Sequence, residues 1–105
     1  MKVNVFEGED QVTLSVIGEV EVYSLPDFSQ IAEKQIGSRR QVVIDMEDLE
    51  YIDSSGLGFI VTYHERLSQK GQQLSLINLR PHVMRVFKIT RLDQILDIVE
   101  TEPAS

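Results

Sequence analysis

The chain has 105 residues, which leaves room for one hydrophobic core and excludes two separate domains. Its formal net charge of −7 argues against a nucleic-acid-binding surface, because phosphate contacts need a basic face. The lack of cysteine excludes disulfides and cysteine-bound zinc, and no apolar run has the length of a signal peptide or a membrane span, so we expect a cytoplasmic protein.

The first third of the sequence predicts a β-hairpin followed by a helix. Apolar residues alternate with polar ones in two segments, which is the period of a half-buried strand. These residues are Val3, Val5, Val12, Leu14 and Val16. Residues 7–10 form the predicted turn, Gly18 ends the second strand, and residues 19–23 form a connector. Residues 24–27, Ser-Leu-Pro-Asp, are typical of a helix start, and Gly37 ends this helix.

The centre of the chain predicts a covered strand, an acidic loop and a second helix. Residues 41–46 form a compact run rich in β-branched side chains, as expected for a strand buried on both faces. After the loop, apolar residues recur at spacings of three and four, the pattern of one helix stripe. The stripe consists of Leu57, Ile60, Val61, His64 and Leu67. Gly71 follows where glycine commonly ends a helix.

The last third predicts a strand over 73–78, a helix from Pro81 and a strand over 95–99, with 101–105 as a frayed tail. The order is then ββαβαβαβ, an α/β class in which right-handed crossovers build a partly parallel sheet over one domain, residues 1–105. Four basic residues lie near the last helix: Arg80, Arg85, Lys88 and Arg91. They indicate a solvated helix face or, alternatively, a docking surface for an acidic partner.

Ser54 lies at the predicted start of the central helix. Free backbone N–H groups and the positive end of the helix dipole meet there, and they hold a negative group, phosphate above all. Asp53, Ser54 and Ser55 are also the residue types that cap helices, so capping alone can explain them. Gly56 and Gly58 each cost a helix about 1 kcal/mol relative to alanine, which indicates that something approaches this backbone closely.

Residues 42–61, VVIDMEDLEYIDSSGLGFIV, closely resemble the signature of the STAS-domain anti-sigma factor antagonists, small bacterial proteins of partner-switching systems. The resemblance covers nearly the whole chain and implies the STAS fold, a small mixed sheet of four to five strands backed by three or more helices. It maps the family's phosphorylated serine onto Ser54. The phosphorylation-site environment and partner-binding surface would then comprise Asp53, Ser55, Gly56, Leu57 and Gly58.

The resemblance also implies a mechanism. The unphosphorylated domain would bind an anti-sigma factor that is also a serine kinase, and thereby free a sigma factor for transcription. The kinase would supply ATP and phosphorylate Ser54, and a metal-dependent serine/threonine phosphatase would reverse the reaction. The alternative is an accessory STAS subunit of a lipid-transport complex or another non-sigma partner switch, and a nucleotide-binding sensor is a more distant one.

Two departures from the family pattern bear on this reading. Glu21 stands where the family usually has an aspartate close to the phosphorylation site, so we keep it as a further candidate for the site environment. The family often carries one more C-terminal helix, and we expect this chain to lack a full one.

Other chemistry has weaker support in the sequence. A serine hydrolase needs a base beside the nucleophile, but His64 lies turns away along the predicted helix and His82 starts another helix. The carboxylates of residues 45–53 lack the spacing of an EF-hand, and a response-regulator receiver would need a further acidic pair after its first strand. We therefore expect no enzyme activity, no metal site and no cofactor.

Overall fold

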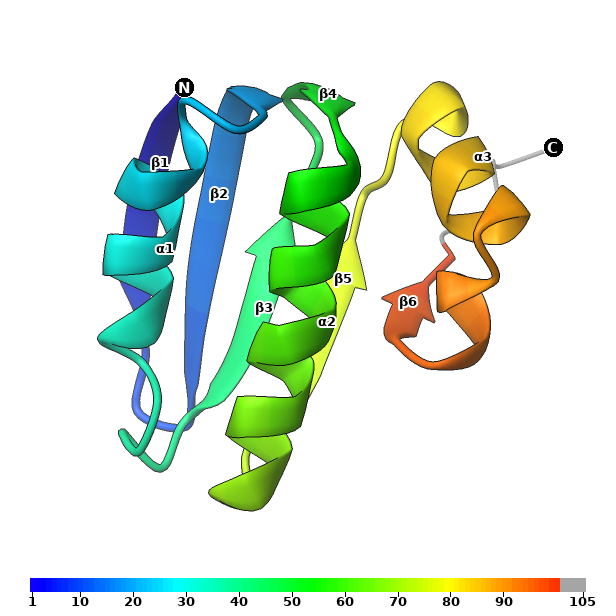
Figure 1. Cartoon of the computed structure of the whole chain (residues 1–105). Helices are drawn as coiled ribbons and strands as arrows, with labels where there is room; N and C mark the ends of the chain where they lie inside the picture. Colours follow the sequence, from blue (N-terminus) through cyan, green and yellow to red (C-terminus); the bar gives the residue numbers. More distant parts are fainter. Residues whose placement is uncertain (101–105) are drawn as a thin grey trace, which may run out of the picture.

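The protein is described by a computed structural model over residues 1–100, and the predicted tail, 101–105, lies outside the described residues. Figure 1 shows a sheet with helices packed against it. In chain order the elements are β1 (Lys2–Glu7), β2 (Gln11–Val20), α1 (Leu25–Glu33), β3 (Gln41–Asp45), β4 (Leu49–Ile52), α2 (Ser54–Gln69), β5 (Leu74–Ile77), α3 (Pro81–Ile89), the short 3-10 helix η1 (Leu92–Gln94) and β6 (Asp97–Val99).

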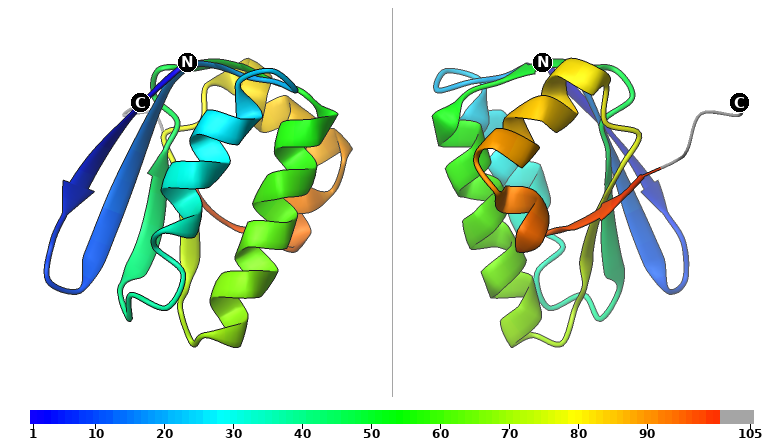
Figure 2. Two further views of the ribbon diagram at one scale, coloured as in Figure 1. Left: turned by 60° about the vertical axis from the view of Figure 1, so that its left-hand side comes forward. Right: turned by 90° about the vertical axis from the view of Figure 1, so that its right-hand side faces the viewer.

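The sheet is mixed, as the sequence predicts. Its strand order is β1-β2-β3-β5-β6, with β4 paired to β2 outside this path. Only β1 and β2 pair antiparallel, as a hairpin, and all other pairs are parallel. Successive crossovers step in the same direction, so the right-handed rule puts α1, α2 and α3 on one face of the sheet. Figure 2 shows the helices on that face.

The core lies between this sheet face and the helices, and aromatic side chains join α1 to α2. The rings of Phe28 and Phe59 meet edge to face with centroids 5.4 Å apart, and Phe59 stacks on Tyr63 at 5.5 Å. The Tyr63 hydroxyl donates to the carbonyl oxygen of Ala32 at 2.7 Å. Burial raises the pKa of Tyr63, because the phenolate would lose its hydration there. This hydroxyl therefore remains a donor that fixes the distance between the two helices.

The apolar stripe of α2 differs from the prediction, because Val61 is only half-buried and Tyr63 replaces His64 in the core. Tyr63 is buried, whereas His64, which was placed on the stripe, is half-buried. Leu57, Ile60 and Leu67 are buried as predicted. Tyrosine and histidine are neighbours in sequence, and the spacing of three and four admits either, so periodicity alone did not distinguish them.

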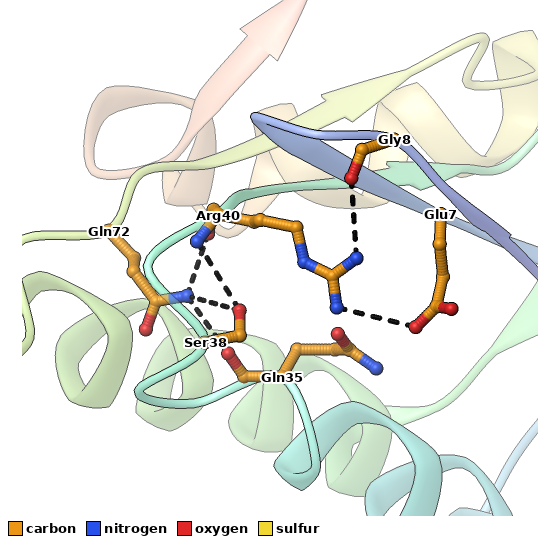
Figure 3. A network of polar contacts seen from close by, with 6 residues as sticks. All are labelled: Glu7, Gly8, Gln35, Ser38, Arg40 and Gln72. Atoms are coloured by element: carbon orange, nitrogen blue, oxygen red, sulfur yellow. Dashed lines mark hydrogen bonds and ion pairs between the residues drawn. The ribbon is translucent and has the colours of Figure 1, made fainter.

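One end of the molecule, which we call the Gln72 end, is closed by a buried polar network (Figure 3). Gln72 is only 4% exposed. Its side-chain oxygen accepts from the N–H of Gly37 at 2.7 Å. Its side-chain nitrogen lies 2.9 Å and 2.7 Å from the carbonyl oxygens of Gln35 and Arg40, and 3.2 Å from the Ser38 hydroxyl. One amide thus satisfies the backbone of the turn that leads from α1 into β3.

The strand count and several boundaries correct the sequence analysis. The sheet has six strands, not four to five, because β4 lies inside the segment predicted as an acidic loop. Its four residues bury only the first and last side chains, so they show no alternation. β2 continues past Gly18 to Val20, and α1 ends at Glu33, before Gly37. The final strand is also shorter than predicted, Asp97–Val99, and follows η1.

Candidate functional site

The site lies at the end opposite the Gln72 network, where β2 changes partner. Residues Gln11–Ser15 of β2 pair with β3, whereas Gly18–Val20 pair with β4, with a register shift at Gly18. Gly18 has φ +99°, a backbone conformation that glycine adopts most readily. The N–H of Asp53 then donates to the carbonyl oxygen of Val20 at 3.1 Å. Through these contacts the start of α2 lies beside the turn between β2 and α1, residues 21–24, and we call this region the Ser54 end (Figure 1).

Asp53 caps α2 and ties the two segments together. Its Oδ1 accepts from the Gly56 N–H at 3.0 Å and from the Ser55 hydroxyl at 2.6 Å. Its Oδ2 accepts from the N–H of Val22 at 3.1 Å, across 31 residues of sequence. The Ser55 hydroxyl first, and then the Gly56 N–H, hold the pKa of Asp53 below its ordinary value, because both stabilise the charged carboxylate. The helix start is therefore an ionised cap with a defined geometry.

The two serines of the motif occupy different environments. Ser54 is the first residue of α2 and is exposed. Ser55 is half-buried, and its hydroxyl donates to Asp53. Among the hydrogen bonds of residues 1–100, none uses the Ser54 hydroxyl. Ser54 thus presents a free hydroxyl at a helix N-terminus, next to backbone N–H groups that favour a negative charge.

The two glycines of the motif also differ, and one of them corrects the sequence analysis. A Cβ on Gly56 would lie 2.7 Å from Cγ1 of Ile52 and 2.9 Å from Cγ1 of Val20, so this glycine is required by the protein's own core. A Cβ on Gly58 would meet nothing within 4 Å. Only Gly58 therefore leaves open space on the surface.

The structure places the remaining candidates as follows. Leu57 is 8% exposed and belongs to the core, so it supports the site from below. The Glu21 carboxylate accepts from the N–H of Ser24 at 2.8 Å and is used within the β2–α1 turn. It reaches the cap only through its neighbour Val22, which bonds to Asp53.

Sequence reasoning missed the apolar surface beside this cap. Val22 and Tyr23 in the turn, and Tyr51 on β4, are all exposed. Tyr51 pairs in register with Glu19 at the end of β2, and so lies near the same end of the sheet. The available signal was the Val-Glu-Val-Tyr run between a strand and a helix, because connecting turns are usually polar.

Within residues 1–100, two of the four basic residues near the last helix form ion pairs. Arg80 from the start of α3 donates from Nε to the carbonyl oxygen of Glu47 at 2.7 Å and lies 3.8 Å from the Asp48 carboxylate. Lys88 pairs with Glu100 at 3.4 Å. Within residues 1–100, no three or more histidine and carboxylate side chains gather closely enough to hold a metal ion. In the same range, no helix is long and apolar enough to span a membrane.

The STAS domain profile matches residues 2–104, that is, almost every residue of the chain. The chain belongs to the STAS-domain family. The anti-sigma-B factor antagonist of Bacillus subtilis is 32% identical over 98 residues, covering 93% of this chain and 90% of that protein. The predicted family and α/β STAS fold are therefore confirmed.

Two solved structures show how closely the STAS fold is shared. An anti-sigma factor antagonist from Mycobacterium paratuberculosis superposes with a TM-score of 0.85, at 22% identity, over 95% of this chain and 86% of that one. The Bacillus cell fate determinant SpoIIAA in its phosphorylated form gives a TM-score of 0.72, at 18% identity, over 94% of this chain and 92% of that one. At these identities the likeness establishes the fold alone.

Proposed function

We propose that this STAS domain is an anti-sigma factor antagonist whose binding surface is switched off by phosphorylation of Ser54. The observation that carries the proposal is the exposed Ser54 hydroxyl at the N-terminus of α2, in contrast to the Ser55 hydroxyl, which Asp53 occupies. The family membership and the Bacillus subtilis relative supply the functional context.

In the proposed cycle, the unphosphorylated domain binds an anti-sigma factor that is also a serine kinase, which frees a sigma factor. The kinase brings the γ-phosphate of its ATP to the Ser54 hydroxyl. A metal-dependent serine/threonine phosphatase removes the phosphate afterwards. The protein itself contributes a binding surface and an acceptor hydroxyl, and no cofactor or catalytic residue of its own.

The charge of the phosphate explains how one modification can end the complex. Phosphorylation adds about −1.5 to −2 charges at pH 7. The N–H groups at the start of α2 tolerate this charge, so the fold is retained. The kinase nucleotide, by contrast, holds negative phosphates directly opposite Ser54, and like charges in contact cost several kcal/mol. The phosphorylated domain is therefore released without refolding.

A phosphorylation assay tests the acceptor. The domain is incubated with ATP and the anti-sigma factor kinase encoded beside its gene, and its intact mass is measured. We expect one added phosphate on the native chain and on the matched control Ser55→Ala, and none on Ser54→Ala. A normal phosphate on Ser54→Ala would move the acceptor elsewhere, and an unmodified native chain would favour the accessory-subunit alternative.

A binding assay tests the charge mechanism. Ser54→Ala should bind the kinase as the native chain does, because it changes neither charge nor fold. Ser54→Asp should bind about 100-fold more weakly, which corresponds to about 2.8 kcal/mol. Equal affinities for these two variants, measured by isothermal calorimetry, would contradict a switch based on charge.

A further inference from the structure

The β2–α1 turn presents two apolar side chains to solvent. Tyr23 is 88% exposed, more than any other large apolar side chain of residues 1–100, and its neighbour Val22 is 58% exposed. Tyrosine is among the residues that contribute most to protein interfaces, because its large ring loses little conformational entropy on binding. A tyrosine and a valine displayed side by side are therefore candidates for contact with a partner.

Hydrogen bonds hold this turn in one conformation. The carboxylate of Glu21 accepts from the N–H of Ser24 at 2.8 Å, and the Ser24 hydroxyl accepts from the N–H of Glu21 at 3.0 Å. The same hydroxyl donates to the carbonyl oxygen of Glu19 at 2.8 Å, and the N–H of Leu25 donates to that of Glu21 at 2.8 Å. Because the backbone is already ordered, a partner that binds the turn pays little for ordering it.

The turn is also attached to the phosphorylation site. The N–H of Val22 donates to Asp53 Oδ2 at 3.1 Å, and Asp53 is the residue directly before Ser54. A protein that brings its active site to the Ser54 hydroxyl thus comes within reach of Val22 and Tyr23.

We propose that Val22 and Tyr23 are the apolar anchor by which the anti-sigma factor kinase docks beside Ser54, and that Glu21 is a positioning residue that holds this anchor. The inference rests on the proposed function and adds to it the contact surface and the chemistry of the partner. It also assigns a role to Glu21 that does not require contact with the phosphate.

The charge at this end defines the partner further. Segments 19–24 and 47–55 contain no lysine or arginine and four exposed carboxylate residues: Glu19, Glu47, Asp48 and Glu50. Arg80 of α3 lies 3.8 Å from the Asp48 carboxylate, so the negative charge left for a partner lies mainly on the other three. A complementary kinase surface carries an apolar pocket for Tyr23, bordered by basic side chains that face the exposed carboxylates.

The anchor is tested by removing the ring. Tyr23→Ala should weaken binding of the ADP-loaded kinase at least 10-fold, whereas Phe6→Ala should leave it unchanged. Phe6 is a matched control because it is 61% exposed and pairs with Thr13, seven residues along β2 from Val20. In the phosphorylation assay Tyr23→Ala should raise KM with kcat unchanged, since the acceptor hydroxyl is intact. Equal binding by both variants overturns the proposal.

The positioning role of Glu21 is tested by removing or keeping the side-chain oxygen that accepts from the Ser24 N–H. Glu21→Ala should weaken kinase binding at least 5-fold, because the Ser24 N–H loses its partner and the turn loosens. Glu21→Gln retains an acceptor oxygen and should restore native affinity. Combined with Tyr23→Ala, Glu21→Ala should cause a smaller additional loss than it causes alone, because the larger side chain of the anchor that it holds is already gone. Fully additive losses, or no rescue by glutamine, overturn the positioning role.

The charge complementarity is tested by two charge-reversal variants that change the net charge of the protein by the same amount. Glu50→Lys, on β4 at the same end of the sheet, should weaken binding about 10-fold at low salt, and the loss should shrink as salt is added. Glu65→Lys, on the exposed side of α2 away from its start, should have no such effect. Equal responses of the two variants overturn the assignment of basic partner side chains.

These experiments separate the two proposals. A native chain that neither binds the kinase nor receives phosphate overturns the proposed function, and the anchor with it. A second outcome is that the native chain binds the kinase, Ser54→Asp does not, and Tyr23→Ala binds as well as Phe6→Ala. In that case the phosphorylation switch is supported and the anchor is overturned. Thermal unfolding of each variant by circular dichroism shows that an affinity change does not come from loss of the fold.

Discussion

At the Gln72 end of the sheet, a buried side-chain amide is bonded to the backbone of a turn, whereas at the Ser54 end a hydroxyl and an aromatic ring face solvent. Both ends join strands to helices through short turns, so the difference does not come from the fold. A buried polar group is costly when it loses its partner, and an exposed one is not. Loss of the buried Gln72 side chain should therefore change stability, whereas loss of the exposed side chains at the Ser54 end should change affinity.

The largest expected change in stability comes from Gln72→Ala. It removes the acceptor of the Gly37 N–H and the amide donor that bonds to the carbonyl oxygens of Gln35 and Arg40, which should lower the free energy of unfolding by about 3 kcal/mol. Gln69→Ala is the control, because Gln69 is an exposed glutamine on α2. Urea unfolding measures both, and below the transition Gln72→Ala should bind the kinase with native affinity. A loss of kinase binding by the folded variant would show that stability and affinity are not controlled at separate ends of the sheet.

The comparison is sharpened by the two glycines at the start of α2, because one belongs to the core and the other to the surface. Gly56→Ala should destabilise the protein by about 2 kcal/mol, since the added methyl group overlaps Ile52 and Val20. Gly58→Ala should stabilise it by up to about 1 kcal/mol, because alanine favours the helix and its methyl group meets nothing. Chemical unfolding measures the change in the free energy of unfolding for both variants. Changes of the same sign would contradict the packing described at Gly56.

The smallest expected effect is the pH dependence contributed by Asp53. Its pKa is lowered in the folded protein from an ordinary value of 3.8, so above that value the ionised cap stabilises the fold. This contribution is lost as the pH falls through 3.8 and then through the lower folded value, because protonation removes the charge that Ser55 and Gly56 stabilise.

Asp53→Asn isolates this contribution, because asparagine also caps helices but does not titrate. The native chain should be more stable than the variant near neutral pH, and the difference should shrink in acid. Urea titrations at several pH values measure it. A difference that stays constant down to pH values below 3.8 would show that the carboxylate charge does not stabilise this cap.

Local signals in the sequence were sufficient for the helices and for most strands. The start of α2 at Ser54 is confirmed, because an aspartate cap followed by a change of period is encoded within a few neighbouring residues. The end of α2 is confirmed as well, with Gly71 at φ +72°. The family resemblance rests on the same contiguous stretch, which is why it could be read without a structure.

Contacts between segments distant in sequence were decided by the tertiary structure alone. The strand β4 exists because Gly18–Val20 of β2 pair with it, and its own four residues carry no periodicity. Position 56 must be glycine because a Cβ there would overlap Val20 of β2. Ser54 rather than Ser55 has the free hydroxyl, because the Ser55 hydroxyl donates to Asp53. The turn with Tyr23 meets the cap through one hydrogen bond across 31 residues. Local sequence encodes where elements begin and end, whereas the site depends on which elements the packed sheet brings together.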